Sequence, residues 1–161
     1  MSRLAPLLKT ALFTVFVPGT VAGYVPWVLR NNAAIATHGI EEAVAIAVVL
    51  TGVLIYLHTA FWGFAWTGAG TPAPIAPPKT LVVKGLHRFV RNPMYVGVLL
   101  AIGGQAWLFL SRRIAVYALL VWVMFHLWVL IYEEPTLRRM FGEEYERYCA
   151  SVPRWLPRLR R

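Results

Sequence analysis

Two short polar motifs border long apolar stretches of this sequence, and their side chains could bind a molecule that carries both charges. The first motif, RNPMYVG at residues 91–97, opens one apolar stretch, and the second, EEP at residues 133–135, closes the next. Arginine, asparagine and tyrosine side chains can hold a carboxylate, whereas adjacent glutamates can hold an ammonium group. If the two motifs meet in space, they predict a site for a zwitterion, and S-adenosylmethionine is such a molecule.

Helix chemistry supports this prediction at the first motif. Pro93 suits the first turn of a helix, where its missing N–H is no loss, and the free N–H groups of that turn favour an anion. Gly97, Ala101 and Gly104 follow at helical spacing. This stripe of small residues admits either a neighbouring helix or a flat ligand.

Other polar residues of the apolar stretches have two interpretations. Glu133 and Glu134 could simply be solvated charges at a helix end, although negative charge is unfavourable at a helix C-terminus. His126 lies seven residues before Glu133 and therefore on the same helix face, either as a substrate contact or as a hydrogen-bonded residue inside the bundle. The same two interpretations apply to His58, in the middle of its apolar stretch, and to Gln105.

The composition places these motifs in a membrane protein. The chain has 161 residues, of which 58% are hydrophobic and 14% charged, and its mean hydropathy is +0.58, which is too apolar for an ordinary soluble domain. A helix needs roughly 20 residues to cross the hydrocarbon core. The charge-free windows therefore predict one all-α domain over residues 1–161, with four spans at about 10–29, 43–66, 93–111 and 114–132.

The connections between the predicted spans decide which motifs are neighbours. Residues 67–80, TGAGTPAPIAPPKT, are rich in Gly and Pro and predict a loop at the membrane surface. Only residues 111–113 separate the third and fourth windows, so these spans should form a tight antiparallel hairpin that brings the two motifs to one membrane face. After Tyr132, charged residues with interleaved aromatic residues predict a short amphipathic helix and a Pro-containing tail.

Positive charges are distributed unequally about the four predicted spans. Of the 16 Lys and Arg residues, only Arg30, Arg112 and Arg113 fall on one side, and the other 13 lie on the side of both termini. The positive-inside rule therefore places both termini and the two motifs in the cytoplasm. This topology accounts for the formal charge of +9, so no nucleic acid partner is required. The sequence also predicts no metal site, because no Cys/His spacing resembles one, and the single Cys149 excludes an intramolecular disulfide.

Three stretches within residues 82–157 resemble a known superfamily. GLHRFVRNPMYVG, AIGGQ and EEPTLRRMFGEEYERYCASVPRWLP are similar to the isoprenylcysteine carboxyl methyltransferases and phospholipid methyltransferases, which are integral membrane enzymes. Asn92 stands where the isoprenylcysteine enzymes have His and is similar to the Asn of phosphatidylethanolamine N-methyltransferases, and His87 stands where the family commonly has Tyr. The resemblance implies a helical bundle that binds S-adenosylmethionine at the cytoplasmic face and takes a lipophilic methyl acceptor from the bilayer.

The resemblance also implies roles for particular residues in the motifs at 84–97 and 133–157. A glutamate would take the ammonium group of the cofactor, Arg154 would fold back to orient an anionic acceptor, and Trp155 would close the site. The cofactor-binding residues would be Gly85, Leu86, His87, Arg91, Asn92, Pro93, Tyr95, Gly97, Glu133 and Glu134, and the catalytic residues Arg91, Glu134, Arg154 and His126. Methyl transfer is an in-line displacement that needs alignment and exclusion of water, so neither a metal nor a covalent intermediate is expected.

The sequence predicts S-adenosylmethionine-dependent methyl transfer to a lipophilic acceptor, and it leaves the acceptor open. A carboxyl acceptor of the isoprenylcysteine type needs a cation to position it. A phospholipid amine must also lose a proton, for which His87, His126 or a glutamate would serve as base. The alternative without enzymatic activity is a small membrane scaffold or a transporter fragment. Broken helices and acidic residues within the spans would favour transport, and apart from Pro18 and Pro26 in the first predicted span the sequence has neither.

Overall fold

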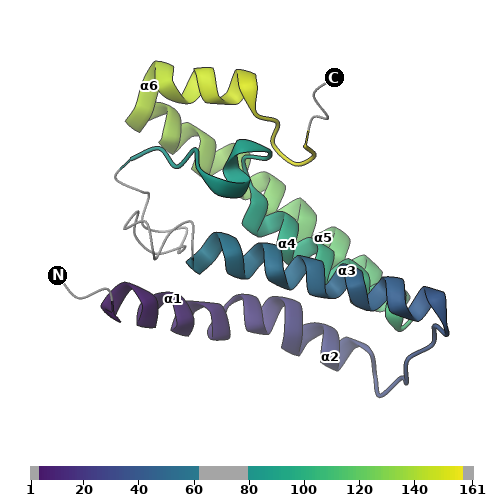
Figure 1. Cartoon of the computed structure of the whole chain (residues 1–161). Helices are drawn as coiled ribbons and strands as arrows, with labels where there is room; N and C mark the ends of the chain where they lie inside the picture. Colours follow the sequence, from purple (N-terminus) through teal and green to yellow (C-terminus); the bar gives the residue numbers. More distant parts are fainter. Residues whose placement is uncertain (1–3, 62–79, 158–161) are drawn as a thin grey trace.

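The fold is built from four apolar helical segments. In the computed structural model, which describes residues 4–61 and 80–157, no strand occurs in these two ranges. The segments lie side by side in Figure 1, and α6 bends back over one end of them. The elements are α1 (Leu4–Phe16), the π-helical turn η1 (Thr20–Tyr24), α2 (Val25–Leu29), α3 (Ile40–Leu57), the 3-10 turn η3 (Gly85–Arg88), α4 (Pro93–Leu108), α5 (Arg112–Trp128), the π-helical turn η4 (Val129–Glu133) and α6 (Glu134–Ser151).

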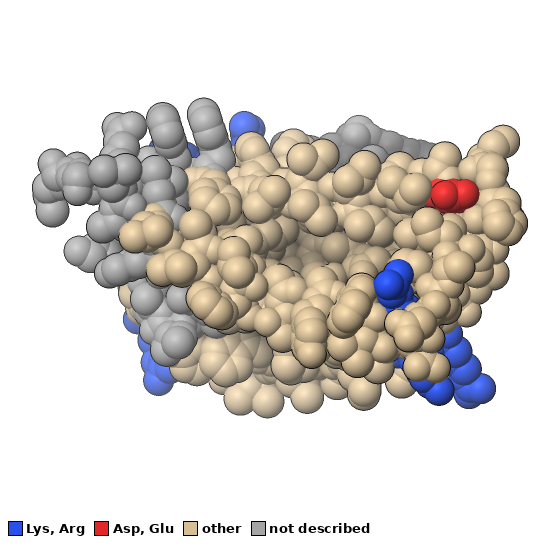
Figure 2. All heavy atoms as spheres, turned by 90° about the horizontal axis from the view of Figure 1, so that it is seen from below, with Lys and Arg blue, Asp and Glu red and all other residues tan. Residues whose placement is uncertain are grey.

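The helices have the length and composition of a membrane bundle. Three continuous helices, Thr10–Leu29, Ile40–Phe61 and Arg112–Ser151, are long and apolar enough to cross a membrane, and Pro93–Leu108 is a shorter apolar helix. One face of the molecule is almost free of charged side chains, which lie toward its two ends (Figure 2). The prediction of an all-α membrane bundle is therefore confirmed.

The bounds of two predicted spans need correction. The second helix begins at Ile40, three residues earlier than predicted, and the third ends at Leu108 rather than at residue 111. His58 is exposed and follows the last residue of α3, and the continuous helix runs on to Phe61, the last described residue of this segment. The end of the second predicted span at residues 62–66, and nearly all of the Gly/Pro-rich loop at 67–80, lie outside the described residues.

Glycine residues allow α3 and α4 to approach each other closely. A Cβ atom added to Gly52 of α3 would lie 2.5 Å from the backbone nitrogen of Ala101, and one added to Gly97 of α4 would lie 2.7 Å from the carbonyl oxygen of Gly52. Gly104 is equally close to the backbone of Val49. The stripe of small residues on α4 is therefore a helix-packing surface, which is the usual role of such a stripe in membranes.

The turn between α4 and α5 confirms the predicted tight hairpin. The backbone N–H of Leu110 donates to the carbonyl of Trp107, and that of Ser111 donates to Ala106, a pair of hydrogen bonds that ends a helix with one residue in the left-handed region. That residue is Leu110, with φ +46°. The Ser111 hydroxyl then accepts from the backbone N–H of Ile114 and caps α5.

Pro26 determines how the first helical segment attaches to the bundle. Because proline has no N–H, it leaves the carbonyl of Ala22 without its helical donor, and in the π-helical register also that of Val21. Side chains of other helices supply the missing donors: Gln105 of α4 donates to Ala22 O at 2.7 Å, and the hydroxyl of Tyr117 of α5 donates to Val21 O at 2.9 Å. Gln105 therefore has a structural partner, as a polar residue in a membrane requires.

The fourth segment differs from the prediction where the functional motif lies. The helix does not end at Tyr132, because α5, η4 and α6 form one continuous helical stretch that passes through Glu133 and Glu134. The break comes later, at Gly142, whose φ of +50° and ψ of −125° separate α6 into two limbs. The second limb turns back (Figure 1), and this reversal returns residues 145–155 to the end of the bundle. The sequence prediction ended the span at Tyr132 because the charge-free window ends there, but charged residues can continue a helix beyond an apolar stretch, and Pro135 lies in the first turn of α6, where proline is tolerated.

Candidate active site

The centre of the candidate site is the buried carboxylate of Glu134. Only 3% of this residue is exposed, and its two oxygens accept from Nε and Nη2 of Arg154 at 2.6 and 3.1 Å. Arg91 Nη1 lies 3.2 Å from Glu134 Oε1, and Arg138 Nη1 lies 3.5 Å from Oε2. The hydrogen bond to Glu134 raises the pKa of Arg154 above its usual value. A buried carboxylate needs such compensation, and here three guanidinium groups supply it.

The start of α4 is bound to the C-terminal tail. The backbone N–H of Arg91 donates to Pro153 O at 2.9 Å, and the amide of the buried Asn92 donates to Arg154 O at 3.2 Å. Arg91 Nη1 also donates to Cys149 Sγ at 2.7 Å. The predicted meeting of the RNPMYVG and EEP motifs therefore occurs, and the tail after Gly142 lies against both of them.

Tyr95 and Glu133 form the second polar pair of the site. The Tyr95 hydroxyl donates to Glu133 Oε2 at 3.1 Å, and the Tyr95 ring stacks on Phe125 with 4.5 Å between the centroids. Among the described residues, this hydrogen bond is the polar contact that the structure gives to Glu133. The two adjacent glutamates thus have different surroundings, since Glu134 is compensated by arginines and Glu133 is bound by a phenol.

The 3-10 turn η3 takes part in the site mainly through its backbone groups. Gly85 has φ +59°, and a Cβ added there would lie 3.6 Å from His58 Nε2 at the end of α3. Leu86 is half-buried, and its carbonyl accepts from the N–H groups of Phe89 and Val90. The carbonyl of His87 accepts from the hydroxyl of Tyr148 at 2.7 Å, which fixes η3 to the second limb of α6. Burial lowers the pKa of His87 to about 4.

His126 lies against the C-terminal tail, close to where the sequence predicted a lid. The indole N–H of Trp155 donates to His126 Nδ1 at 3.2 Å, and the Trp122 ring stacks on the imidazole. The Trp155 ring also lies 6.5 Å from that of Tyr95. His126 is therefore engaged by the tail and does not contact the glutamate pair directly among the interactions of the described residues.

Two of the predicted cofactor-binding residues have structural roles. Gly97 is buried against the backbone of Gly52 and Tyr56, so it is a helix contact in this structure, and its role in cofactor binding stays a prediction. Pro93 is buried at the first turn of α4, as predicted from the tolerance of that position for proline.

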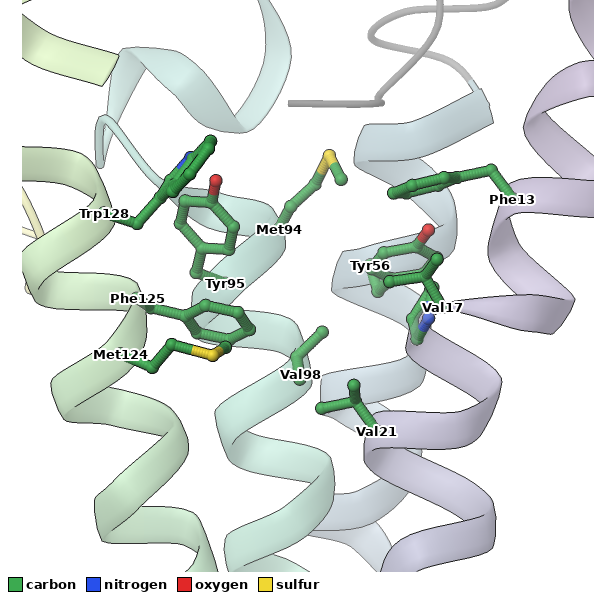
Figure 3. A pocket seen from close by; sticks show the side chains of 11 residues that line it. Phe13, Val17, Val21, Tyr56, Met94, Tyr95, Val98, Met124, Phe125 and Trp128 are labelled. Carbon is green, nitrogen blue, oxygen red and sulfur yellow. The ribbon is translucent and has the colours of Figure 1, made fainter. Parts of the chain in front are cut away.

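An apolar pocket adjoins the polar cluster. It has a volume of about 250 Å³ and lies between α1, η1, α3, α4 and α5. Tyr95 belongs to both sites, since its ring lines the pocket while its hydroxyl reaches Glu133 (Figure 3). The remaining walls are Phe13, Val17, Pro18, Val21, Tyr56, Met94, Val98, Met124, Phe125 and Trp128. An apolar cavity that ends at a few convergent polar groups is the usual form of a small-molecule site.

Sequence reasoning missed three parts of this site. It did not include Cys149 and Arg138, whose roles depend on the reversal at Gly142. A glycine inside an amphipathic helical pattern is a known sign of a break, so Gly142 was the available signal. It also missed the contribution of the first span to the pocket, for which apolar residues such as Phe13 carry no distinguishing signal. Within residues 4–61 and 80–157, no group of three His, Cys, Asp or Glu side chains could hold a metal.

Comparison with known proteins gives a family and a set of relatives. The phospholipid methyltransferase family matches residues 40–144. A probable protein-S-isoprenylcysteine O-methyltransferase of Oryza sativa subsp. indica is 37% identical over 78 residues, which are 48% of this chain and 40% of the relative. Protein-S-isoprenylcysteine O-methyltransferase B of Arabidopsis thaliana is 33% identical over 78 residues, 48% of this chain and 39% of the relative. The enzyme of Schizosaccharomyces pombe is 35% identical over the same length, covering 48% of this chain and 33% of the relative.

These alignments cover less than half of each relative, so the resemblance concerns a part of those enzymes. No solved structure matches the chain significantly.

Proposed function

We propose, from the premise that this chain belongs to the phospholipid methyltransferase family, that it transfers a methyl group from S-adenosylmethionine to a carboxylate at the end of a lipophilic molecule. The observation that carries this proposal is the position of Tyr95, where an apolar pocket meets a cluster of charged side chains. An acceptor with a hydrocarbon chain in the pocket would present its polar end to that cluster.

The residues of the cluster fit the charged groups of S-adenosylmethionine. Arg91 Nε is buried and has no hydrogen-bond partner among the described residues, so it can donate to a carboxylate. Glu133, held by Tyr95, can accept from an ammonium group. When bound, S-adenosylmethionine supplies an electrophilic methyl group. This assignment narrows the sequence prediction, which gave the ammonium to one of the two glutamates.

Glu134 would then act as a positioning residue. Its carboxylate holds the guanidinium groups of Arg91, which lies just before α4, and Arg154, which lies in the tail after α6. The bidentate contact fixes the plane of the Arg154 guanidinium. In this role Glu134 aligns the two cations that face the acceptor, and alignment is the main contribution an enzyme can make to an in-line displacement.

The donors of the cluster favour a carboxylate acceptor over an amine. Arg138 is also paired with Glu146, so the three guanidinium groups and three carboxylates balance in charge, but Arg91 and Arg154 still offer N–H groups that can donate to a carboxylate. A carboxylate needs no base, whereas an amine must lose a proton. Burial lowers the pKa of His87 and makes it a poor base for that step, and Nδ1 of His126 already accepts from the indole N–H of Trp155.

The tail would exclude water from this reaction. The Trp155 ring lies 6.0 Å from that of His126 and 6.5 Å from that of Tyr95, a position from which it would cover the junction of pocket and cluster. Exclusion of water strengthens the electrostatic interactions of the site. The excess of Lys and Arg at this end of the bundle supports a cytoplasmic position of the site and of both termini.

Calorimetry on purified protein in detergent micelles tests the cofactor assignment. We expect micromolar or tighter binding of S-adenosylmethionine, on the order of 8 kcal/mol. Glu133→Gln should weaken it roughly ten- to a hundred-fold, since a charge-assisted hydrogen bond contributes about 1.5 to 3 kcal/mol. Glu144→Gln, at an exposed position of α6, is the matched control. Absence of binding to the folded wild-type protein would contradict the proposal.

A further inference from the structure

We propose that Val21, in the first helical segment, is the floor of the acceptor pocket and limits the length of the hydrocarbon chain that the pocket accepts. This inference rests on the proposed function, because the occupant is taken to be the lipophilic acceptor. Val21 lines the pocket together with Phe13 and Val17, which precede it at intervals of four residues. In Figure 3 these side chains form a series that begins near the level of the Tyr95 hydroxyl and ends at Val21.

The length of the pocket can be estimated from the spacing of these three residues along the helix. With a helical rise of 1.5 Å per residue, the eight residues from Phe13 to Val21 span roughly 12 Å. Val98 of α4 lies opposite Val21 at the deep end, and the polar groups lie at the other end. A chain whose polar end is at Tyr95 would therefore meet Val21 after a limited number of carbons.

The floor is held in place by hydrogen bonds. The carbonyl of Val21 itself accepts from Tyr117, and that of the next residue, Ala22, accepts from Gln105. Both contacts exist because Pro26 removes the donors that the helix would otherwise supply. A backbone carbonyl without a hydrogen-bond donor is energetically costly in a membrane. These two side chains therefore fix the backbone at Val21.

The walls of the pocket divide into two groups. Those from α3, α4 and α5 fall within residues 40–144, the region that matches the family, and they include Tyr95 of the polar cluster. The wall from α1 and η1 lies outside that region. Chain-length selection can therefore be altered at Val21 without altering the groups that face the cofactor.

The test uses N-acetyl-S-alkylcysteines with hexyl, decyl and tetradecyl chains, because an extended decyl chain is about as long as the series of roughly 12 Å from Phe13 to Val21. Two readouts are measured on the purified protein: methyl ester formation, and displacement of a dansyl-labelled decyl probe. Val21→Phe raises the floor by about two methylenes, so we expect the preference for decyl over hexyl to fall about tenfold in both readouts. Val21→Ala should shift the preference in the opposite direction, toward longer chains. Val15→Phe, on the same helix but 65% exposed, should leave the profile unchanged.

The outcomes separate this inference from the proposed function. If wild-type protein forms no methyl ester with any chain, the proposed function fails, and the displacement profiles still decide whether Val21 limits chain length. If folded Val21→Phe and Val21→Ala both have the profile of Val15→Phe, Val21 is not the floor and the inference is wrong. Displacement that is independent of chain length in the wild-type protein would also contradict it, since it would identify the pocket as an unselective site for bilayer lipid.

Discussion

Replacing Glu134 by glutamine should destabilise the cytoplasmic end of the protein. The substitution keeps the size of the side chain but removes the charge that faces Arg91, Arg154 and Arg138. Removing one partner of a fully buried ion pair costs about 3 to 5 kcal/mol. Because the side chain of Arg154 is 28% exposed and that of Arg138 is 44% exposed, water can partly compensate them, and we expect a smaller loss of about 2 to 3 kcal/mol.

Thermal unfolding in detergent measures this loss. By the scaling of small domains, it corresponds to a decrease of roughly 5 to 10 °C in the unfolding midpoint. The tail that Arg154 anchors should also become more susceptible to protease at residues 152–157. Glu143→Gln, at an exposed position on the same helix, serves as the control and should change neither quantity. An unchanged midpoint and unchanged protease resistance in Glu134→Gln would refute the role of Glu134 as the centre of the cluster.

Three further substitutions test the elements that position the site. Tyr117→Phe removes the donor to Val21 O and should lower the stability in detergent by roughly 0.6 kcal/mol, at most about 1.7. Gly142→Ala forces a residue with a Cβ into φ +50°, which should cost on the order of 1 to 3 kcal/mol and increase protease cleavage of the tail. His87→Asn should remove a pH dependence of the stability. Because folding lowers the pKa of His87 from 6.5 to about 4, the wild-type protein is most stable above pH 6.5 and loses stability as the pH falls toward 4. Unfolding midpoints measured across that pH range test this expectation.

Matched controls exist for each of these substitutions. Tyr24→Phe changes an exposed tyrosine of the same helical segment that Tyr117 anchors and should be neutral. Gly103→Ala places a Cβ where no atom lies within 4 Å and where φ is not positive, so it should be neutral or slightly stabilising. His38→Asn, at an exposed position, should leave the pH dependence unchanged. If a test variant behaves like its control, the element it tests does not have the proposed role.

Composition and local signals were sufficient to predict the bundle. Charge-free windows located the four apolar helical segments, and the three residues between two of these windows predicted the hairpin that brings Tyr95 to Glu133. The motif residues Arg91 and Glu134 were identified because cationic and acidic side chains at the ends of neighbouring apolar stretches could together hold a zwitterion. These predictions depend on local composition and helical geometry, which the sequence carries directly.

The partners of these residues depend on tertiary structure, which the sequence did not reveal. The pairing of Glu134 with Arg154 requires the reversal at Gly142, a single backbone conformation 12 residues before Arg154 that hydrophobic periodicity does not encode. Likewise, Gln105 was recognised as needing a partner, but the freed carbonyl of Ala22 follows from the position of Pro26 relative to another helix. The sequence left open whether Gly97 admits a ligand or a helix, and only the position of α3 reveals the helix contact.

The most direct test of the proposed function is the chemical form of the transferred methyl group. Purified protein in liposomes that contain phosphatidylethanolamine receives methyl-labelled S-adenosylmethionine and N-acetyl-S-farnesylcysteine. We expect the label in the cysteine derivative as an ester, which mild base releases as labelled methanol. Label that is stable to base and recovered in the phospholipid headgroup, or no transfer at all from a protein that is folded, would contradict a carboxyl methyltransferase.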